Sequence, residues 1–195
     1  MEIKTLVLGP LNTNCYLLWD EPSLEAMVID PADEGDLISE EILRNNLQLK
    51  YIVLTHGHFD HIMGLLELKL NFPQAQILVH EKDLFLLESL PQRAEYWLKR
   101  PVDPAPKPDA FLQNLDYLKI GNYKLKIIHT PGHTPGSICL YNDEVIFTGD
   151  TLFADGNIGR SDFSYSSPAD LKKSLQKISK LANSPAGERK IYSGH

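Results

Sequence analysis

The chain has 195 residues, of which 43% are hydrophobic, and a formal net charge of −7 from 19 basic and 26 acidic side chains. This length suits one domain with a full core, or one domain with a small lobe, and the composition excludes a disordered chain. The charge balance is acidic and no block of Lys or Arg is present, so the sequence lacks the basic footprint that nucleic acid requires. We therefore expect a globular protein without a nucleic-acid partner.

The N-terminal segment and the two cysteines indicate the compartment. Residues 1–20 lack the basic start, apolar run and small-residue cleavage site of a signal peptide. No stretch approaches the roughly 20 apolar residues of a membrane span. Cys15 and Cys139 lie inside apolar strand patterns, which favours buried thiols over a disulfide. We expect a cytoplasmic protein with no membrane partner.

In the first half of the chain, apolar strand patterns are interspersed with helical patterns. Strands are expected at 3–9, 15–19, 26–30, 51–55 and 76–80, and helices at 34–46, 62–72 and 81–90. The run 51–55 is apolar at almost every position, which is typical of a strand that is covered on both faces. Residues 91–108 carry five prolines, so we expect a long loop there that connects the two halves rather than borders a site.

The second half begins again with strands and ends with a helix and a strand. Strands are expected at 116–121, 123–129, 137–142, 144–150 and 190–194, and a helix at 167–182. Ser167 suits the cap of this helix, Pro168 its first turn and Asp170 its positive dipole end. Each half thus places strands before an amphipathic helix, which predicts two packed sheets with helices outside.

Three of the seven histidines fall within the six residues of "HGHFDH", at positions 56–61. A polar loop can collect histidines by chance. However, imidazole is the commonest transition-metal ligand, and the carboxylate of Asp60 beside His56, His58 and His61 suits zinc, iron or manganese. The loop also follows a rigid strand and leads into a helix, so its side chains can converge on one point. We interpret this loop as part of a metal site.

Further ligand candidates stand at three other strand ends. His133, Asp150 and His195 each follow an apolar strand and are directly preceded by a glycine, which allows close backbone approach. Taken singly, each residue could be a turn residue or a helix cap. Taken with the loop at 56–61, they predict one metal site assembled from separate strand ends.

The segments "THGHFDH", "TPGHTPGS", "FTGD" and "SGH", in this order across nearly the whole chain, resemble the metallo-β-lactamase superfamily. The resemblance implies an α/β fold, a four-layer αββα sandwich, with two divalent metal ions at the strand ends, zinc being favoured over iron or manganese. It implies that each metal has three ligands of its own and that one carboxylate bridges the pair. These residues are His56, His58 and His133 for the first metal, Asp60, His61 and His195 for the second, and Asp150 as the bridge.

The stretch "GDTLFADGNIGRSDF" resembles glyoxalase II and its single-domain relatives, the hydroxyacylglutathione-hydrolase-like proteins. This implies an enzyme that hydrolyses a small-molecule thioester with a hydroxide shared by two metals, which Asp60 and Asp150 orient. Three alternatives remain: a persulfide dioxygenase with one iron, a lactonase, and a metal-stabilised domain without activity. Family members continue past the last histidine. We therefore expect residues 1–195 to form one such domain that lacks its C-terminal end, with the second metal bound more weakly.

Other polar residues near these motifs have two interpretations each. Asp30 matches a strand-end aspartate of the superfamily, and we favour a role in orienting a ligand histidine over a turn residue. Arg160 lies near a basic substrate-binding position of glyoxalase II, where it could bind a substrate carboxylate, or it could pair with Asp162. His80 and His129 match no ligand position and are interpreted as structural.

Overall fold

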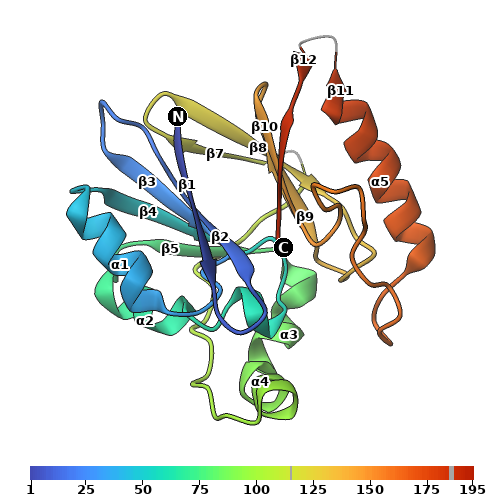
Figure 1. Cartoon of the computed structure of the whole chain (residues 1–195), viewed down its shortest axis with the longest axis horizontal. Helices are drawn as coiled ribbons and strands as arrows, with labels where there is room; N and C mark the ends of the chain where they lie inside the picture. The colour runs from blue at the N-terminus through green and yellow to red at the C-terminus, as the bar shows by residue number, and fades with distance from the viewer. Residues whose placement is uncertain (115, 185–186) are drawn as a thin grey trace.

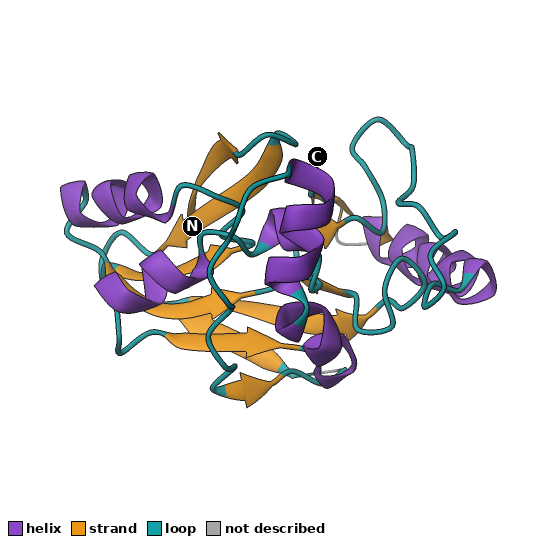
Figure 2. Cartoon of the chain, turned by 90° about the horizontal axis from the view of Figure 1, so that it is seen from below, coloured by secondary structure: helices purple, strands orange, loops and turns teal. Residues whose placement is uncertain are grey.

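A computed structural model describes residues 1–114, 116–184 and 187–195 of the chain. Two β-sheets pack against each other, and helices cover both outer faces (Figure 1). Helices α1 and α2 lie beside the first sheet and helix α5 beside the second, and the perpendicular view in Figure 2 shows the strands enclosed between helices. The expected four-layer αββα sandwich is therefore confirmed.

The first sheet has six strands in the order β1-β2-β3-β4-β5-β6. The pairs β1–β2 and β2–β3 are antiparallel, whereas β3–β4, β4–β5 and β5–β6 are parallel. The strands are β1 Glu2–Leu8, β2 Thr13–Trp19, β3 Glu25–Ile29, β4 Gln48–Val53, β5 Gln76–Val79 and β6 Ala110–Phe111. The parallel strands direct the carboxyl ends of β3 and β4 to the same edge of the sheet.

The second sheet has five strands in the order β13-β10-β9-β8-β7. Only the β10–β13 pair is parallel, so these two strands also end at one edge. The strands are β7 Tyr117–Ile120, β8 Tyr123–His129, β9 Ile138–Tyr141, β10 Val145–Gly149 and β13 Lys190–Ser193. Strand β11 Asn183–Ser184 pairs antiparallel with β12 Gly187–Glu188 in a separate two-stranded sheet.

Helices lie at all four places where the sequence predicts them, within slightly shorter bounds, and α4 is an additional helix that was not expected. They are α1 Gly35–Arg44, η1 Phe59–His61, α2 Leu65–Asn71, η2 Glu81–Asp83, α3 Leu84–Glu88, α4 Leu90–Leu98 and α5 Pro168–Ala182. At the start of α5 the Ser167 hydroxyl accepts a hydrogen bond from the Asp170 backbone N–H at 3.2 Å, which confirms the predicted cap. Leu171 and Ile178 are buried on α5, and Ile178 packs with Cys139 and Ile146 of the second sheet.

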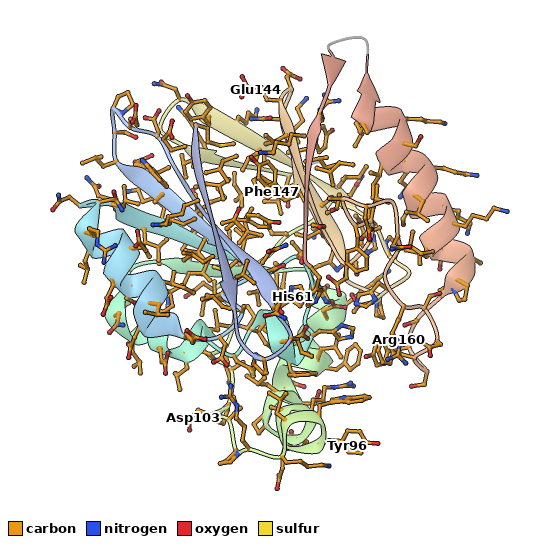
Figure 3. All side chains as sticks on the ribbon, in the orientation of Figure 1. His61, Tyr96, Asp103, Glu144, Phe147 and Arg160 are labelled. Atoms are coloured by element: carbon orange, nitrogen blue, oxygen red, sulfur yellow. The ribbon has the colours of Figure 1, made fainter. Side chains whose placement is uncertain are left out.

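The core consists of three apolar layers between the four structural layers. In β2, Cys15 and Leu17 face the layer under the first helices, while Tyr16 and Leu18 face the layer between the sheets. This is the two-residue alternation of a strand that is buried on both faces. Phe147 of β10 lies in the central layer (Figure 3). Both sheets are thus fixed relative to each other by side chains that water does not reach.

One expected element is wrong. Residues 91–98 are not loop but the body of helix α4, and the irregular connection begins only after this helix. Pro91 stands in the first helical turn, where a missing backbone N–H costs nothing. The other four prolines all follow the helix. A high proline content therefore does not exclude a helix when the proline within the helix lies in its first turn.

Two expectations from composition have structural outcomes. Cys15 and Cys139 are both buried and free, as expected, and no disulfide joins them. None of the helices in the described part of the chain combines the length and apolar character needed to cross a membrane.

Candidate metal centre

The predicted ligand residues meet at one edge of the sandwich, where strands of both sheets end. The loop after β4 carries the segment 56–61, and the segments after β8, β10 and β13 carry His133, Asp150 and His195. His61 lies at this edge, below the apolar layer that contains Phe147 (Figure 3). Residues far apart in sequence thus converge because parallel strand ends share an edge.

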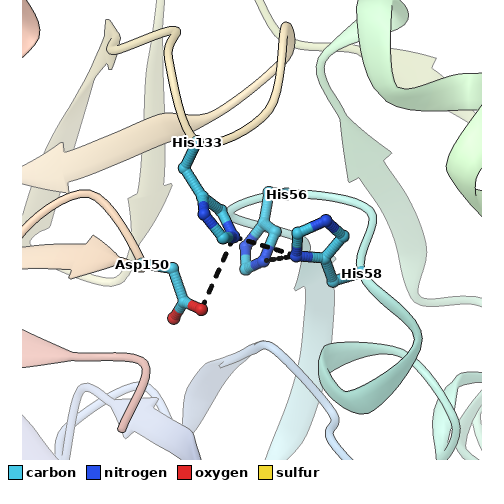
Figure 4. A group of neighbouring side chains, drawn as sticks. All are labelled: His56, His58, His133 and Asp150. Atoms are coloured by element: carbon cyan, nitrogen blue, oxygen red, sulfur yellow. Dashed lines mark hydrogen bonds and ion pairs between the residues drawn. The ribbon is translucent and has the colours of Figure 1, made fainter. Parts of the chain in front are cut away.

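The first group of potential ligands comprises His56, His58, His133 and Asp150, all of which are buried (Figure 4). Nδ1 of His58 lies 3.1 Å from Nε2 of His56 and 2.9 Å from Nε2 of His133. Nε2 of His133 lies 3.6 Å from a carboxylate oxygen of Asp150. Three ring nitrogens and a carboxylate therefore face one point.

The second group comprises Asp60, His61 and His195. Nε2 of His195 lies 3.3 Å from Oδ2 of Asp60, and Nε2 of His61 lies 3.7 Å from the same atom. Asp150 stands between the two groups, since one of its oxygens is 3.4 Å from Nε2 of His61 while the other is 3.6 Å from Nε2 of His133. A carboxylate in this place can serve both groups.

The outward nitrogen of each ligand histidine has a partner outside the cluster. Nδ1–H of His133 donates to the Arg160 carbonyl at 2.7 Å, and Nδ1–H of His195 donates to the Leu11 carbonyl at 3.1 Å. Nε2 of His58 lies 2.9 Å from the Tyr165 hydroxyl. The two carbonyl contacts require a proton on Nδ1 of His133 and of His195, so Nε2 of each neutral ring carries no proton and is free to bind a metal, and the Tyr165 hydroxyl can accept a proton from Nε2 of His58 in the same way.

The donor set fits divalent metal ions. Among the described residues, Nε2 of His61 and Oδ1 of Asp150 are buried polar atoms without a hydrogen-bond partner, which is costly unless another group completes them. Burial, reinforced by the neighbouring His133, lowers the pKa of His58 to about 3, so this ring stays neutral. Imidazole nitrogens combined with two carboxylates suit zinc, iron or manganese.

Glycine is required at the positions where backbone and ligands crowd together. A Cβ on Gly194 would lie 2.1 Å from Oδ1 of Asp150, and Gly149 adopts a φ of 48°. Both positions therefore exclude larger residues. This agrees with the expectation that glycines bring the strand ends close to the site.

Asp30 lies behind the ligands, at the end of β3. Its Oδ2 accepts hydrogen bonds from Nδ1–H of His61 at 3.0 Å and from the Thr55 hydroxyl at 2.6 Å, and its Oδ1 accepts from the Thr55 backbone N–H at 2.7 Å. The Thr55 hydroxyl oxygen in turn lies 3.1 Å from Nδ1 of His56. Asp30 thus contacts one ligand histidine directly, in line with the orienting role that the sequence favoured. It reaches a second ligand histidine through Thr55, for which the sequence analysis proposed no role.

Asp83 is a second buried carboxylate that supports the ligand loops, and no sequence motif indicated this role. It accepts hydrogen bonds from the Gly57 N–H at 2.9 Å, the Thr134 hydroxyl at 2.6 Å and the Gly136 N–H at 2.6 Å. Gly57 lies between two ligand histidines, and Thr134 follows His133. One side chain from η2 therefore ties both ligand-bearing loops together.

A cavity of about 500 Å³ opens above the cluster of potential metal ligands and reaches the surface. Its floor contains His58, Asp60, His133, Asp150 and His195. Its walls come from the β1–β2 turn, η1, α4 and the segment after β10, and consist of Leu11, Phe59, Arg93, Trp97, Leu98, Phe153, Ile158, Arg160, Phe163 and Tyr165. The expectation that residues 91–108 only connect the two halves is therefore wrong, because α4 forms one wall.

Arg160 lines this cavity, but its guanidinium also forms the pair with Asp162 that the sequence left open. Nε and Nη2 of Arg160 donate to the two Asp162 oxygens at 3.0 and 2.9 Å, and both side chains are exposed. His80 and His129 stack on each other at 4.1 Å between ring centroids. Neither belongs to a ligand group among the described residues.

The αββα sandwich with His/Asp clusters at its strand-end edge defines a metal-binding class of α/β proteins, and comparisons with known proteins assign the family. The model of the metallo-beta-lactamase superfamily matches residues 8–195. Hydroxyacylglutathione hydrolase GloC of Haemophilus influenzae is 39% identical over 165 residues, which cover 84% of this chain and 77% of that protein. The chain belongs to the metallo-beta-lactamase superfamily.

Two solved structures share the fold closely. BLEG-1, described as a B3 metallo-beta-lactamase, has a TM-score of 0.85 and 33% identity over 100% of this chain and 91% of its own. TTHA1623, solved in a di-iron-bound form, has a TM-score of 0.85 and 30% identity over 98% of this chain and 91% of its own. The resemblance seen in the sequence motifs is thus confirmed at the level of the superfamily.

Proposed function

We propose that the protein is a binuclear metal-dependent hydrolase that cleaves small-molecule thioesters of the hydroxyacylglutathione type. The observation that carries the proposal is the position of Asp150 between two groups of potential ligands, at the floor of a cavity that is large enough for a substrate. The similarity to GloC supports the substrate class.

In this proposal His56, His58 and His133 hold one metal, Asp60, His61 and His195 hold the other, and Asp150 bridges them. Zinc is the favoured metal, although the di-iron form of TTHA1623 keeps iron in consideration and manganese suits the same ligands. When bound, two such ions would supply a nucleophile from water at neutral pH and polarise a substrate carbonyl.

Two carboxylates on the cavity floor determine the charge around the reacting group. Asp60 and Asp150 place negative charge on the floor of the cavity, where it would offset the charge of bound metal ions and orient the attacking water. They are the only carboxylates among the described residues that line the cavity. A thioester suits this arrangement because its thiolate has a conjugate-acid pKa of about 8.5, if it resembles cysteine, and leaves without a separate proton donor.

Metal analysis of protein purified without added metal, combined with substrate assays, tests the proposal. We expect two divalent ions per chain and hydrolysis of a hydroxyacyl thioester of glutathione. A lactone and a β-lactam should be hydrolysed more slowly than the thioester. One iron per chain with oxygen uptake on a persulfide would instead identify a dioxygenase, and metal without turnover of any of these compounds would identify a non-catalytic domain.

A further inference from the structure

Arg93 places a positive charge in the wall of the cavity. It belongs to helix α4, which was expected to be loop, and no sequence pattern placed it near the site. Its Nε donates to the Ser89 hydroxyl at 2.8 Å, its Nη1 lies 3.4 Å from the Tyr165 hydroxyl, and its guanidinium carbon lies 5.2 Å from the centre of the Tyr165 ring. These contacts fix the direction of the guanidinium.

The charge of Arg93 has no carboxylate partner within the described residues. Two other arginines are paired, Arg160 of the same cavity wall with Asp162 and Arg100, which follows α4, with Asp33. A guanidinium has five N–H groups. The contacts with Ser89 and Tyr165 use two of these, which leaves three for a ligand. Arg93 is therefore a fixed, half-buried cation whose remaining donors point to no anion of the protein itself.

We propose that Arg93 binds a carboxylate of the substrate. The inference deepens the proposed function and rests on it for the thioester bond. The Tyr165 hydroxyl that contacts Arg93 also contacts Nε2 of His58, so the carboxylate would sit one side chain away from the metal cluster. The planar fork of arginine matches the two oxygens of a carboxylate.

A single carboxylate fits better than a polyphosphate. Groups with several negative charges need several cations, and the described lining of the cavity holds only Arg93 and the already paired Arg160 as permanent cations. The chain as a whole carries a net charge of −7, which disfavours highly anionic ligands. The substrate class is therefore a thioester with a carboxylate on one of its two portions.

The rest of the cavity wall fits an apolar group. Trp97, Ile158 and Leu11 come from three separate segments and are 53%, 48% and 45% exposed, yet all three line this one cavity. Large apolar side chains that gather around one opening mark a binding surface. The substrate would thus combine a carboxylate at Arg93 with an apolar portion against Trp97 and Ile158.

A matched pair of substrates tests the carboxylate. The probes are one acyl thioester of 3-mercaptopropionic acid and the same thioester of its methyl ester, which differ by a single charge. Arg93→Gln should raise KM for the acid about 10- to 100-fold, with KM for the ester and kcat for both changed less than about threefold. Arg93→Lys should restore part of the preference for the acid because it keeps the charge.

The control variant is Lys99→Gln, which removes one positive charge from the end of the same helix without lining the cavity. It should leave both KM values unchanged. Equal effects of Arg93→Gln on the two substrates, or no effect on either, would overturn the proposal. A rise in KM for the acid in Arg160→Gln, with none in Arg93→Gln, would also overturn it.

A binding measurement separates this inference from the proposed hydrolysis. The chain has two tryptophans, so Trp19→Phe leaves Trp97 as the only fluorescent indole, inside the cavity wall. Thioether analogues of the acid and the ester, which cannot be hydrolysed, should quench it with tighter binding of the acid, and Arg93→Gln should abolish the difference. If this holds while no thioester is turned over, only the proposed function fails. If the acid binds no tighter than the ester, the role of Arg93 is refuted.

Discussion

The carboxylate of Asp30 and the ring of His61 form a buried pair, with 3.0 Å between Oδ2 and Nδ1. Asp30 adopts a φ of 51°, in the left-handed region that few residues other than glycine occupy. The same carboxylate accepts two hydrogen bonds from Thr55, whose hydroxyl contacts His56. Asp30 therefore fixes the ring orientation of one histidine from each proposed metal group.

Asp30→Asn should weaken both metal sites. An amide cannot accept from Nδ1–H of His61 and from Thr55 with equal strength, so the rings lose their fixed orientation, and metal affinity should fall about 10- to 100-fold. Competition with a chelator measures the two affinities. Thr55→Val removes the contact with His56 and the hydroxyl's hydrogen bond to Asp30 but keeps the contact between Asp30 and His61, so it should affect the first group more than the second. Unchanged affinities in folded Asp30→Asn would contradict this role.

Asp150→Ala should remove binuclear metal binding and hydrolysis together. Asp150 is the residue within 3.6 Å of both groups, through different oxygens, so its loss opens both coordination shells. We expect fewer than two metals per chain by mass spectrometry and no thioester turnover. Asp155→Ala, at an exposed turn where the carboxylate contacts Asn157, is the matched control. Two metals per chain with activity retained would show that Asp150 is not the bridge.

Asp83→Asn should lower metal affinity at least about tenfold although Asp83 is not a ligand, because it holds the loops of His58 and His133 together. The control is Asp20→Asn, which alters another buried aspartate, one that accepts from the backbone and the hydroxyl of Ser23 and lines no part of the site. Both variants should lose about 1–3 kcal/mol of unfolding free energy. Only Asp83→Asn should change the metal titration, and equal titrations would reduce Asp83 to a purely structural residue.

Asp83 should also give the metal-free protein a measurable pH dependence. Burial raises the pKa of Asp83 to about 6 despite its three hydrogen bonds, against an ordinary value of 3.8. The folded state then binds the proton more tightly than the unfolded state, so the unfolding free energy falls as the pH rises from about 4 to about 6, by up to about 3 kcal/mol. The asparagine of Asp83→Asn does not titrate, so this contribution to the pH dependence of the unfolding free energy is absent from the variant.

The difference in unfolding free energy between wild type and Asp83→Asn isolates this effect. Urea unfolding of both metal-free proteins between pH 4 and pH 7 measures it, and the other titrating groups largely cancel in the difference. The advantage of the wild type should be largest at pH 4 and shrink toward pH 6. A difference that is constant with pH would mean that Asp83 titrates at its ordinary pKa.

Much of the architecture and the candidate ligand set followed from the sequence alone. A strand that is buried on both faces has an apolar run such as 51–55. The end of such a strand is marked in the sequence by a polar residue next to a small one. Because the carboxyl ends of these strands share an edge, the sequence alone was enough to predict that His133, Asp150 and His195 form one site with the loop at 56–61. Local chemistry and strand direction were sufficient for that step.

The tertiary structure alone decided which residues support the metal cluster and which line the cavity above it. Arg93 and Trp97 reach the cavity only because Pro91 occupies a helical first turn, so that residues 90–98 form a wall. Asp83 joins two loops through hydrogen bonds across 26 and 53 residues of sequence. Such contacts leave no periodic signal, since they depend on how packed elements bring distant side chains together, whereas strand ends are marked by the residues themselves.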